Sequence, residues 1–147
     1  MKNEENFLIE IDGTQFSNGS EDSLRLSTLG SFGKKPNGDF QISYYETEAT
    51  GFAGDLTTLT IDDAQKVTLS RSGATNTQLI LEKNQRHLCH YDTPYGNLIV
   101  GINADTIVNE LADNGGFLRF RYSLDVNANE LSVNELKIKV TENKKYV

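Results

Sequence analysis

The chain of 147 residues is long enough for one folded domain, which we expect to span residues 1–147. Its 21 acidic residues outnumber 14 basic ones, and the net charge of −7 argues against binding to the phosphate backbone of a nucleic acid. One Cys and two His residues exclude a disulfide framework and a cysteine-rich zinc module. No apolar stretch has the length of a membrane span, and the acidic start does not resemble a signal peptide, so we expect a cytoplasmic protein without membrane partners.

Short-range alternation of apolar and polar residues runs along the chain and predicts antiparallel β-strands. Every second residue is apolar in the segments 7–11, 24–26, 40–44, 67–69, 79–81 and 118–126. Because successive side chains of a strand point to opposite faces, each segment has one apolar and one polar face. Turn residues separate the segments, among them Asn18-Gly19, Pro36-Asn37-Gly38, Ser72-Gly73, Pro94-Tyr95-Gly96 and Asn114-Gly115-Gly116.

Two segments need a closer interpretation. The residues 104–111 have some helical character, but β-branched residues at 106–108 favour a long strand that bends near Gly101, with a short helix as the alternative. Near the end of the chain, Leu131 and Val133 differ in parity from the apolar residues 136, 138 and 140. This change predicts a β-bulge near Asn134 and Glu135.

The number and spacing of these strands predict an all-β fold. About ten strands joined by hairpins form a meander, and a meander hides its edges best by closing on itself. We therefore predict an antiparallel meander closed into a β-barrel of roughly eight to ten strands.

The residue types that carry catalysis are poorly placed for it. In the segment His87-Leu88-Cys89-His90 a strand lets at most two of the three possible ligands converge, and the chain has no further Cys or His to complete a zinc site. Cys89 lies within a strand, where nothing lowers its pKa, and no Gly-x-Ser-x-Gly motif is present. We therefore expect no metal, no cofactor and no enzymatic activity.

Two charged residues continue the apolar face of their strands. Arg71 follows two apolar residues at alternate positions, and Glu46 follows three. An ionised group on a core face needs a partner or an opening to water. Either both strands have ended and the side chains reach water at a rim, or the two residues pair inside the barrel. In the second interpretation Tyr44, Tyr91 or Tyr122 supplies hydroxyl groups around them.

A proline turn follows one of these tyrosines. In Thr93-Pro94-Tyr95-Gly96, Pro fixes φ at the first central position of a tight hairpin, and Gly96 is expected to have a positive φ. Tyr95 could also project over a barrel opening. The candidate ligand-binding residues are therefore Tyr44, Glu46, Arg71, Tyr91, Tyr95 and Tyr122.

Four local patterns occur in order along the chain: Tyr44-Tyr45-Glu46, Val67 to Gly73 (VTLSRSG), Tyr91 to Gly96 (YDTPYG) and Leu118 to Tyr122 (LRFRY). With these patterns the chain resembles the YwiB-like family of small bacterial proteins, a domain of unknown function assigned to the calycin barrels, which include the lipocalins. The resemblance extends from about residue 7 to residue 140. It implies an up-and-down barrel and supplies no reaction or ligand. The lipocalin Gly-x-Trp signature is absent, because the chain has no Trp.

Two hypotheses on function follow. In the first, the barrel is a non-enzymatic protein that binds a small molecule or a peptide segment in its interior or mouth. In the second, the acidic outer surface binds a protein partner and the interior is fully packed.

Overall fold

The computed structural model describes residues 6–47, 50, 52–62, 66–74, 76–93 and 96–143, and this part of the chain holds ten β-strands and no α-helix. The all-β prediction is thereby confirmed, and none of these residues belongs to a helix that could cross a membrane. The strands are β1 (Phe7–Ser17), β2 (Ser20–Lys34), β3 (Phe40–Tyr45), β4 (Leu56–Ile61), β5 (Lys66–Ser72), β6 (Thr77–Glu82), β7 (Arg86–Thr93), β8 (Gly96–Ala112), β9 (Gly115–Val126) and β10 (Asn129–Glu142).

All ten strands belong to one antiparallel sheet with the order β6-β5-β4-β3-β2-β1-β10-β9-β8-β7. The first and last strands of the chain pair along most of their length, from Phe7 opposite Glu142 to Phe16 opposite Val133. The two strands at the ends of this order, β6 and β7, follow one another in the chain. The predicted meander therefore curls into a nearly closed barrel.

Side chains join β6 to β7 at the seam of the barrel. In the described part of the chain these two strands share no ladder of backbone hydrogen bonds. Instead, the backbone N–H of Ile80 donates to Sγ of Cys89 at 3.4 Å, and the N–H of Asp92 donates to Oγ1 of Thr77 at 3.1 Å. The prediction of a closed barrel is thus met except along this one seam.

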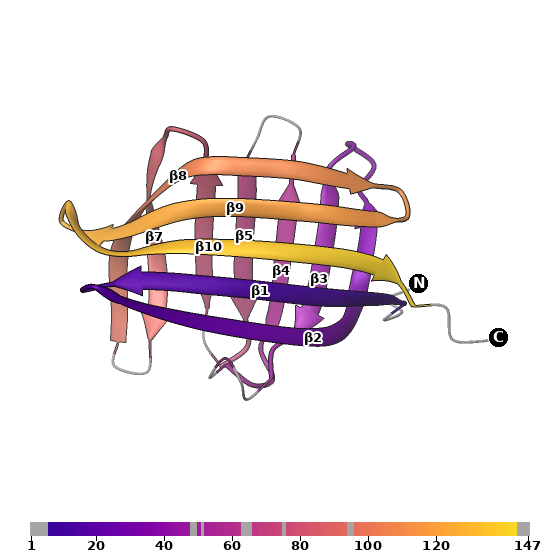
Figure 1. Cartoon of the computed structure of the whole chain (residues 1–147), viewed down its shortest axis with the longest axis horizontal. Coiled ribbons are helices and arrows are strands. Elements are labelled where there is room, and N and C mark those ends of the chain that lie inside the picture. Colours follow the sequence, from indigo (N-terminus) through magenta and orange to yellow (C-terminus); the bar gives the residue numbers. More distant parts are fainter. Residues whose placement is uncertain are drawn as a thin grey trace.

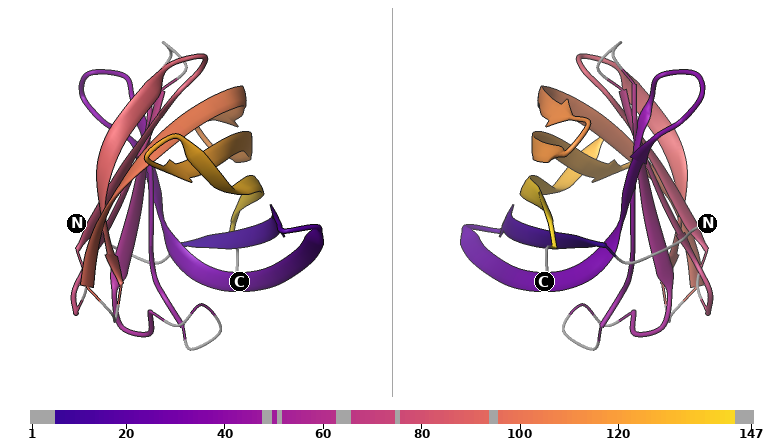
Figure 2. Two further views of the ribbon diagram at one scale, coloured as in Figure 1. Left: turned by 90° about the vertical axis from the view of Figure 1, so that its left-hand side faces the viewer. Right: turned by 90° about the vertical axis from the view of Figure 1, so that its right-hand side faces the viewer.

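The barrel is flattened into two layers whose strands cross. Figure 1 shows β1, β2, β8, β9 and β10 in front of β3, β4, β5 and β7, and Figure 2 shows β2 curving from one layer toward the other. The bend in β2 lies at Gly30, the last residue of β2 that pairs with β1, because Ser31 already pairs with β3. A Cβ atom on Gly30 would lie 2.4 Å from the carbonyl oxygen of Ser43 and 2.5 Å from Cδ1 of Ile9. Only glycine therefore fits at this corner.

The core lies between the two layers, and the alternation predicted which side chains form it. The largest fully buried residues include Ile9, Ile42, Leu59, Leu81 and Phe120, one from each of five strands. Polar residues alternate with them on the outer face. Leu24, also expected on the apolar face, is instead 40% exposed.

The strand β8 decides between the two interpretations of residues 104–111. Residues 104–111 are strand, so the helical alternative is wrong. The long strand is confirmed, and its pairing with β9 shifts register between Ala104 and Thr106, where Asp105 is left out.

The bulge in β10 also lies elsewhere than predicted. Pairing is regular around Asn134 and Glu135, and the register shift falls at Leu131, which is 49% exposed. Leu131 is left out of the ladder, and Val133 pairs with the exposed Phe16 instead of belonging to the core. The parity of the core therefore never changes along this strand, and two apolar residues outside the core produced the misleading pattern.

The hairpin between β7 and β8 contains Gly96, which is expected to need a positive φ. Thr93 pairs with Gly96, while Pro94 and Tyr95 lie outside the described residues. Gly96 has the predicted positive φ, at +125°, and a Cβ atom there would meet no other atom within 4 Å. Gly96→Val should therefore lower the free energy of unfolding through backbone strain alone, by about 1 kcal/mol, as measured by urea denaturation. A change below about 0.3 kcal/mol would contradict this expectation.

Candidate functional site

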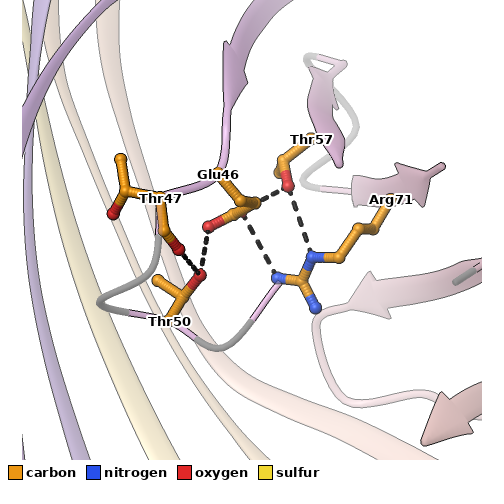
Figure 3. A network of polar contacts seen from close by, with 5 residues as sticks. All are labelled: Glu46, Thr47, Thr50, Thr57 and Arg71. Carbon is orange, nitrogen blue, oxygen red and sulfur yellow. Dashed lines mark hydrogen bonds and ion pairs between the residues drawn. The ribbon is translucent and has the colours of Figure 1, made fainter. Parts of the chain in front are cut away.

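Glu46 and Arg71 point into the barrel and form an ion pair, which is the second of the two interpretations of their parity. The Nη2 atom of Arg71 lies 3.6 Å from Oε2 of Glu46, as Figure 3 shows. The Glu46 side chain is 2% exposed and the Arg71 side chain 14% exposed. The interpretation as two solvent-exposed rim residues is therefore wrong.

The strand register places these residues side by side. Tyr44 on β3 pairs with Thr57 on β4, and Thr57 pairs with Arg71 on β5, so the three residues form a row across the sheet. Glu46 lies two residues beyond Tyr44, on the same face. Its backbone N–H donates to the carbonyl oxygen of Asp55 at 2.8 Å, which extends the pairing of the two strands past the end of β3.

Two threonine hydroxyl groups donate to the Glu46 carboxylate. The hydroxyl of Thr50 donates to Oε1 at 2.9 Å, and that of Thr57 donates to Oε2 (Figure 3). A buried carboxylate needs such donors, because a buried charge without hydrogen bonds or a partner destabilises the fold. Glu46 is therefore well satisfied by neighbours other than Arg71.

Arg71 is held more loosely than Glu46. Its Nε donates to the hydroxyl of Thr57 at 3.4 Å, and its contact to Glu46 at 3.6 Å is longer than a hydrogen bond. The ring of Phe52 lies 4.1 Å from Cζ and covers one face of the guanidinium. Among the residues drawn in Figure 3, its third nitrogen contacts none. A guanidinium has five N–H donors, so these contacts use only part of its capacity.

The tyrosines near the pair stay protonated. Burial raises the pKa of Tyr44, and the negative charge of Glu46 raises it further. Burial likewise raises the pKa of Tyr122, with Tyr91 adding to the shift. The positive charge of Arg71 acts in the opposite direction on both phenols, so all of these side chains are close enough to interact. Near neutral pH the two phenols are therefore hydrogen-bond donors.

A cavity of about 330 Å³ opens beside the hairpin of β1 and β2. Of the predicted residues, Tyr44, Glu46, Arg71 and Tyr91 line it. Tyr122 is half-buried and packs against the core next to these residues, while Tyr95 lies outside the described residues. The apolar part of the lining comes from four residues of β1, β2 and β10: Ile11, Leu24, Leu26 and Leu136.

Residues 9–138 match the family described as a domain of unknown function, DUF1934. The chain belongs to this family. The solved structures include a similar fold in the crystal structure of ywiB protein from Bacillus subtilis, with a TM-score of 0.82 and 17% sequence identity. The match covers 94% of this chain and 92% of the ywiB chain, and at this identity it shows the fold alone. The resemblance to the YwiB-like family is thereby confirmed, and no curated protein matches.

Sequence reasoning missed two residues of the site in this DUF1934 chain. Thr57 is fully buried and links Glu46 to Arg71, and Thr50 contributes the second threonine hydroxyl. Threonine is common on both faces of strands, so its identity did not indicate a buried position. Only the register of β4 between β3 and β5 places Thr57 inside.

A second ion pair was also missed, because its partners are far apart in the sequence. Arg86 on β7 donates from Nε and Nη2 to the two carboxylate oxygens of Asp125 on β9, at 3.0 and 2.6 Å. A Cβ atom on Gly101, in the strand between them, would lie 2.4 Å from Nε of Arg86 and 2.6 Å from Oδ2 of Asp125. Gly101 therefore leaves room for a side-chain bridge across three strands.

This bridge predicts an acid-dependent contribution to stability. The hydrogen bond from Arg86 lowers the pKa of Asp125 below its ordinary value of 3.8. The contribution is therefore fully present above the pKa of the unfolded state and is lost as the pH falls through the lower pKa of the folded state. Between pH ~5 and pH ~3 the free energy of unfolding should fall more steeply in wild type than in Asp125→Asn. The free energy of unfolding is measured by urea denaturation at pH ~5 and at pH ~3. An equal fall in wild type and in Asp125→Asn would contradict the role of Asp125.

The residues considered for a metal site are dispersed. Nε2 of His87 lies 2.9 Å from Oε1 of Glu82, Cys89 is buried in the core, and His90 is exposed. Within the described ranges, no three His, Cys, Asp or Glu side chains come close enough to hold a metal ion.

Proposed function

We propose that this protein binds a small molecule in the cavity beside Arg71 and Glu46 without catalysing a reaction. The observation that carries the proposal is the cavity itself, which combines apolar residues of β1, β2 and β10 with the polar residues around Arg71 and lies beside the packed core. Ligand sites are typically concavities of about 300–1,000 Å³ lined by apolar side chains and a few well-placed polar groups. The cavity of about 330 Å³ lies at the lower end of this range, which favours a small molecule over a peptide segment.

The contacts around Glu46 favour binding over catalysis. A general base needs a carboxylate that can reach a substrate proton. Glu46 is 2% exposed and already accepts from hydroxyl groups, so it is poorly placed for that role. The open space also disfavours the alternative function, in which the barrel interior is fully packed and only the acidic outer surface acts.

Binding can be tested with three probes that share one apolar body: phenylbutyrate, phenylbutanol and phenylbutylamine. We expect at least one of them to bind wild type with saturation and a stoichiometry of one in isothermal titration calorimetry. Leu24→Trp should weaken this binding by about tenfold or more, because Leu24 lines the cavity and its exposed position allows the larger side chain. Leu29→Trp is the matched control, since Leu29 lies on the same strand with similar exposure and does not line the cavity.

Two results would contradict the proposal. One is the failure of all three probes to bind the folded wild-type protein. The other is a probe that binds Leu24→Trp as tightly as it binds wild type, because its site would then lie elsewhere.

A further inference from the structure

We infer that the ligand of this cavity carries a carboxylate, which Arg71 binds through paired hydrogen bonds from its guanidinium group. The inference rests on the proposed function and adds the chemical class of the ligand. It follows from the unequal contacts of the two members of the ion pair.

Arg71 is the member with donors to spare. Among the described residues its polar contacts are Thr57 at 3.4 Å and Glu46 at 3.6 Å, and both distances are long. Its side chain lines the cavity and is 14% exposed, so a ligand can reach it. Oxygen acceptors at normal hydrogen-bond distances would be new contacts for this guanidinium.

Glu46 lies beside only one nitrogen of Arg71, Nη2 at 3.6 Å. Its oxygens accept from the hydroxyls of Thr50 and Thr57, and its side chain is 2% exposed. The other carboxylate in the lining, Asp22, belongs to the hairpin of β1 and β2. An ammonium group beside Arg71 would therefore meet the accessible charge of Arg71 rather than the enclosed charge of Glu46. Repulsion between the two cations disfavours an amine at this end of the cavity.

The orientation of the guanidinium favours a planar acceptor. Phe52 covers one face at 4.1 Å, and Thr57 and Glu46 lie along the edge formed by Nε and Nη2. The edge between Nη1 and Nη2 is therefore the part left for a ligand. A carboxylate matches two parallel N–H donors on such an edge, whereas an alcohol accepts only from one of them. The phenol of Tyr91 also lines the cavity and adds a neighbouring hydroxyl.

The rest of the cavity sets the size and character of the ligand body. Ile11, Leu26 and Leu136 form an apolar wall next to the polar end. The volume of about 330 Å³ is at the lower end of the range for ligand sites. A short aliphatic or arylaliphatic acid of about a dozen non-hydrogen atoms, such as phenylbutyrate, fits this description.

The test compares the three probes in wild type and in two matched variants. Wild type should bind phenylbutyrate at least about tenfold more tightly than phenylbutanol, with phenylbutylamine the weakest. Arg71→Lys keeps the positive charge and removes the planar fork, so the preference for the acid over the alcohol should fall to less than about threefold. Arg86→Lys changes an arginine that donates from two nitrogens to Asp125 and does not line the cavity, so this variant should keep the full preference.

The outcomes separate the two proposals. Two results would contradict the inference that the ligand carries a carboxylate: equal binding of the acid and the alcohol by wild type, or an unchanged preference in Arg71→Lys. Neither result would contradict the cavity as the binding site. Binding of none of the probes would instead overturn the proposed function. If Arg71→Lys does not fold, the double variant Arg71→Met with Glu46→Gln takes its place and should bind the alcohol but lose the preference for the acid.

Discussion

Replacing Arg71 with Ala is expected to lower the free energy of unfolding by about 3 kcal/mol. The substitution leaves the carboxylate of Glu46, which is 2% exposed, without a cation. Removal of one partner of a buried ion pair typically costs about 3–5 kcal/mol, and the hydroxyl groups that still donate to Glu46 place this case at the lower end. Urea denaturation followed by circular dichroism measures the change.

The double variant Arg71→Met with Glu46→Gln separates charge from packing. Both charges are gone, and the amide oxygen of the introduced glutamine still accepts from the hydroxyls of Thr50 and Thr57. We expect this variant to lie within about 1 kcal/mol of wild type. Arg25→Ala is the control, because Arg25 pairs with Asp12 at 2.6 Å on the exposed surface and its loss should leave stability unchanged.

Two results would contradict this account of the pair. A loss below about 0.5 kcal/mol in Arg71→Ala would mean that Glu46 does not depend on the arginine. A double variant as unstable as Arg71→Ala would mean that the arginine acts through packing, for example against Phe52, and not through its charge.

Gly30→Val should destabilise the barrel by about 3 kcal/mol or more. The new Cβ atom would lie 2.4 Å from the carbonyl oxygen of Ser43, a backbone atom that cannot move without disturbing the pairing of β2 with β3. Overpacking alone costs about 1–3 kcal/mol, and here it falls at the corner where β2 passes from one layer to the other. The free energy of unfolding from urea denaturation gives the answer.

Gly33→Val is the matched control for this corner. Gly33 lies on the same strand, and a Cβ atom on it would meet no atom within 4 Å. Because valine also favours strands, we expect no loss of stability there. If Gly30→Val and Gly33→Val lose similar free energies of unfolding, the corner of β2 has no special need for glycine.

The sequence predicted the fold and the central pair because both depend on alternation. The parity of β3 continues past its end, so Glu46 lies inside although it follows the strand, and Arg71 lies inside at the end of β5. The same argument was wrong at Leu131 and Val133, which are apolar residues outside the core. Alternation alone does not distinguish an apolar residue on the outer face from a change of register.

The remaining parts of the site depend on contacts between distant strands. Thr57 becomes the link between Glu46 and Arg71 only because β4 lies between β3 and β5 in register. Arg86 and Asp125 meet across 39 residues of sequence through a gap that Gly101 provides. The cavity likewise forms where β1, β2 and β10 meet β3 and β5, an arrangement that local patterns do not specify.

A crystal structure of the protein with saturating phenylbutyrate tests the central claim most directly. The account predicts density for the acid in the cavity, with both carboxylate oxygens about 3 Å from the guanidinium nitrogens of Arg71 and the phenyl ring against Leu26 and Leu136. Density for phenylbutyrate only on the outer surface, with water alone beside Arg71, would contradict it.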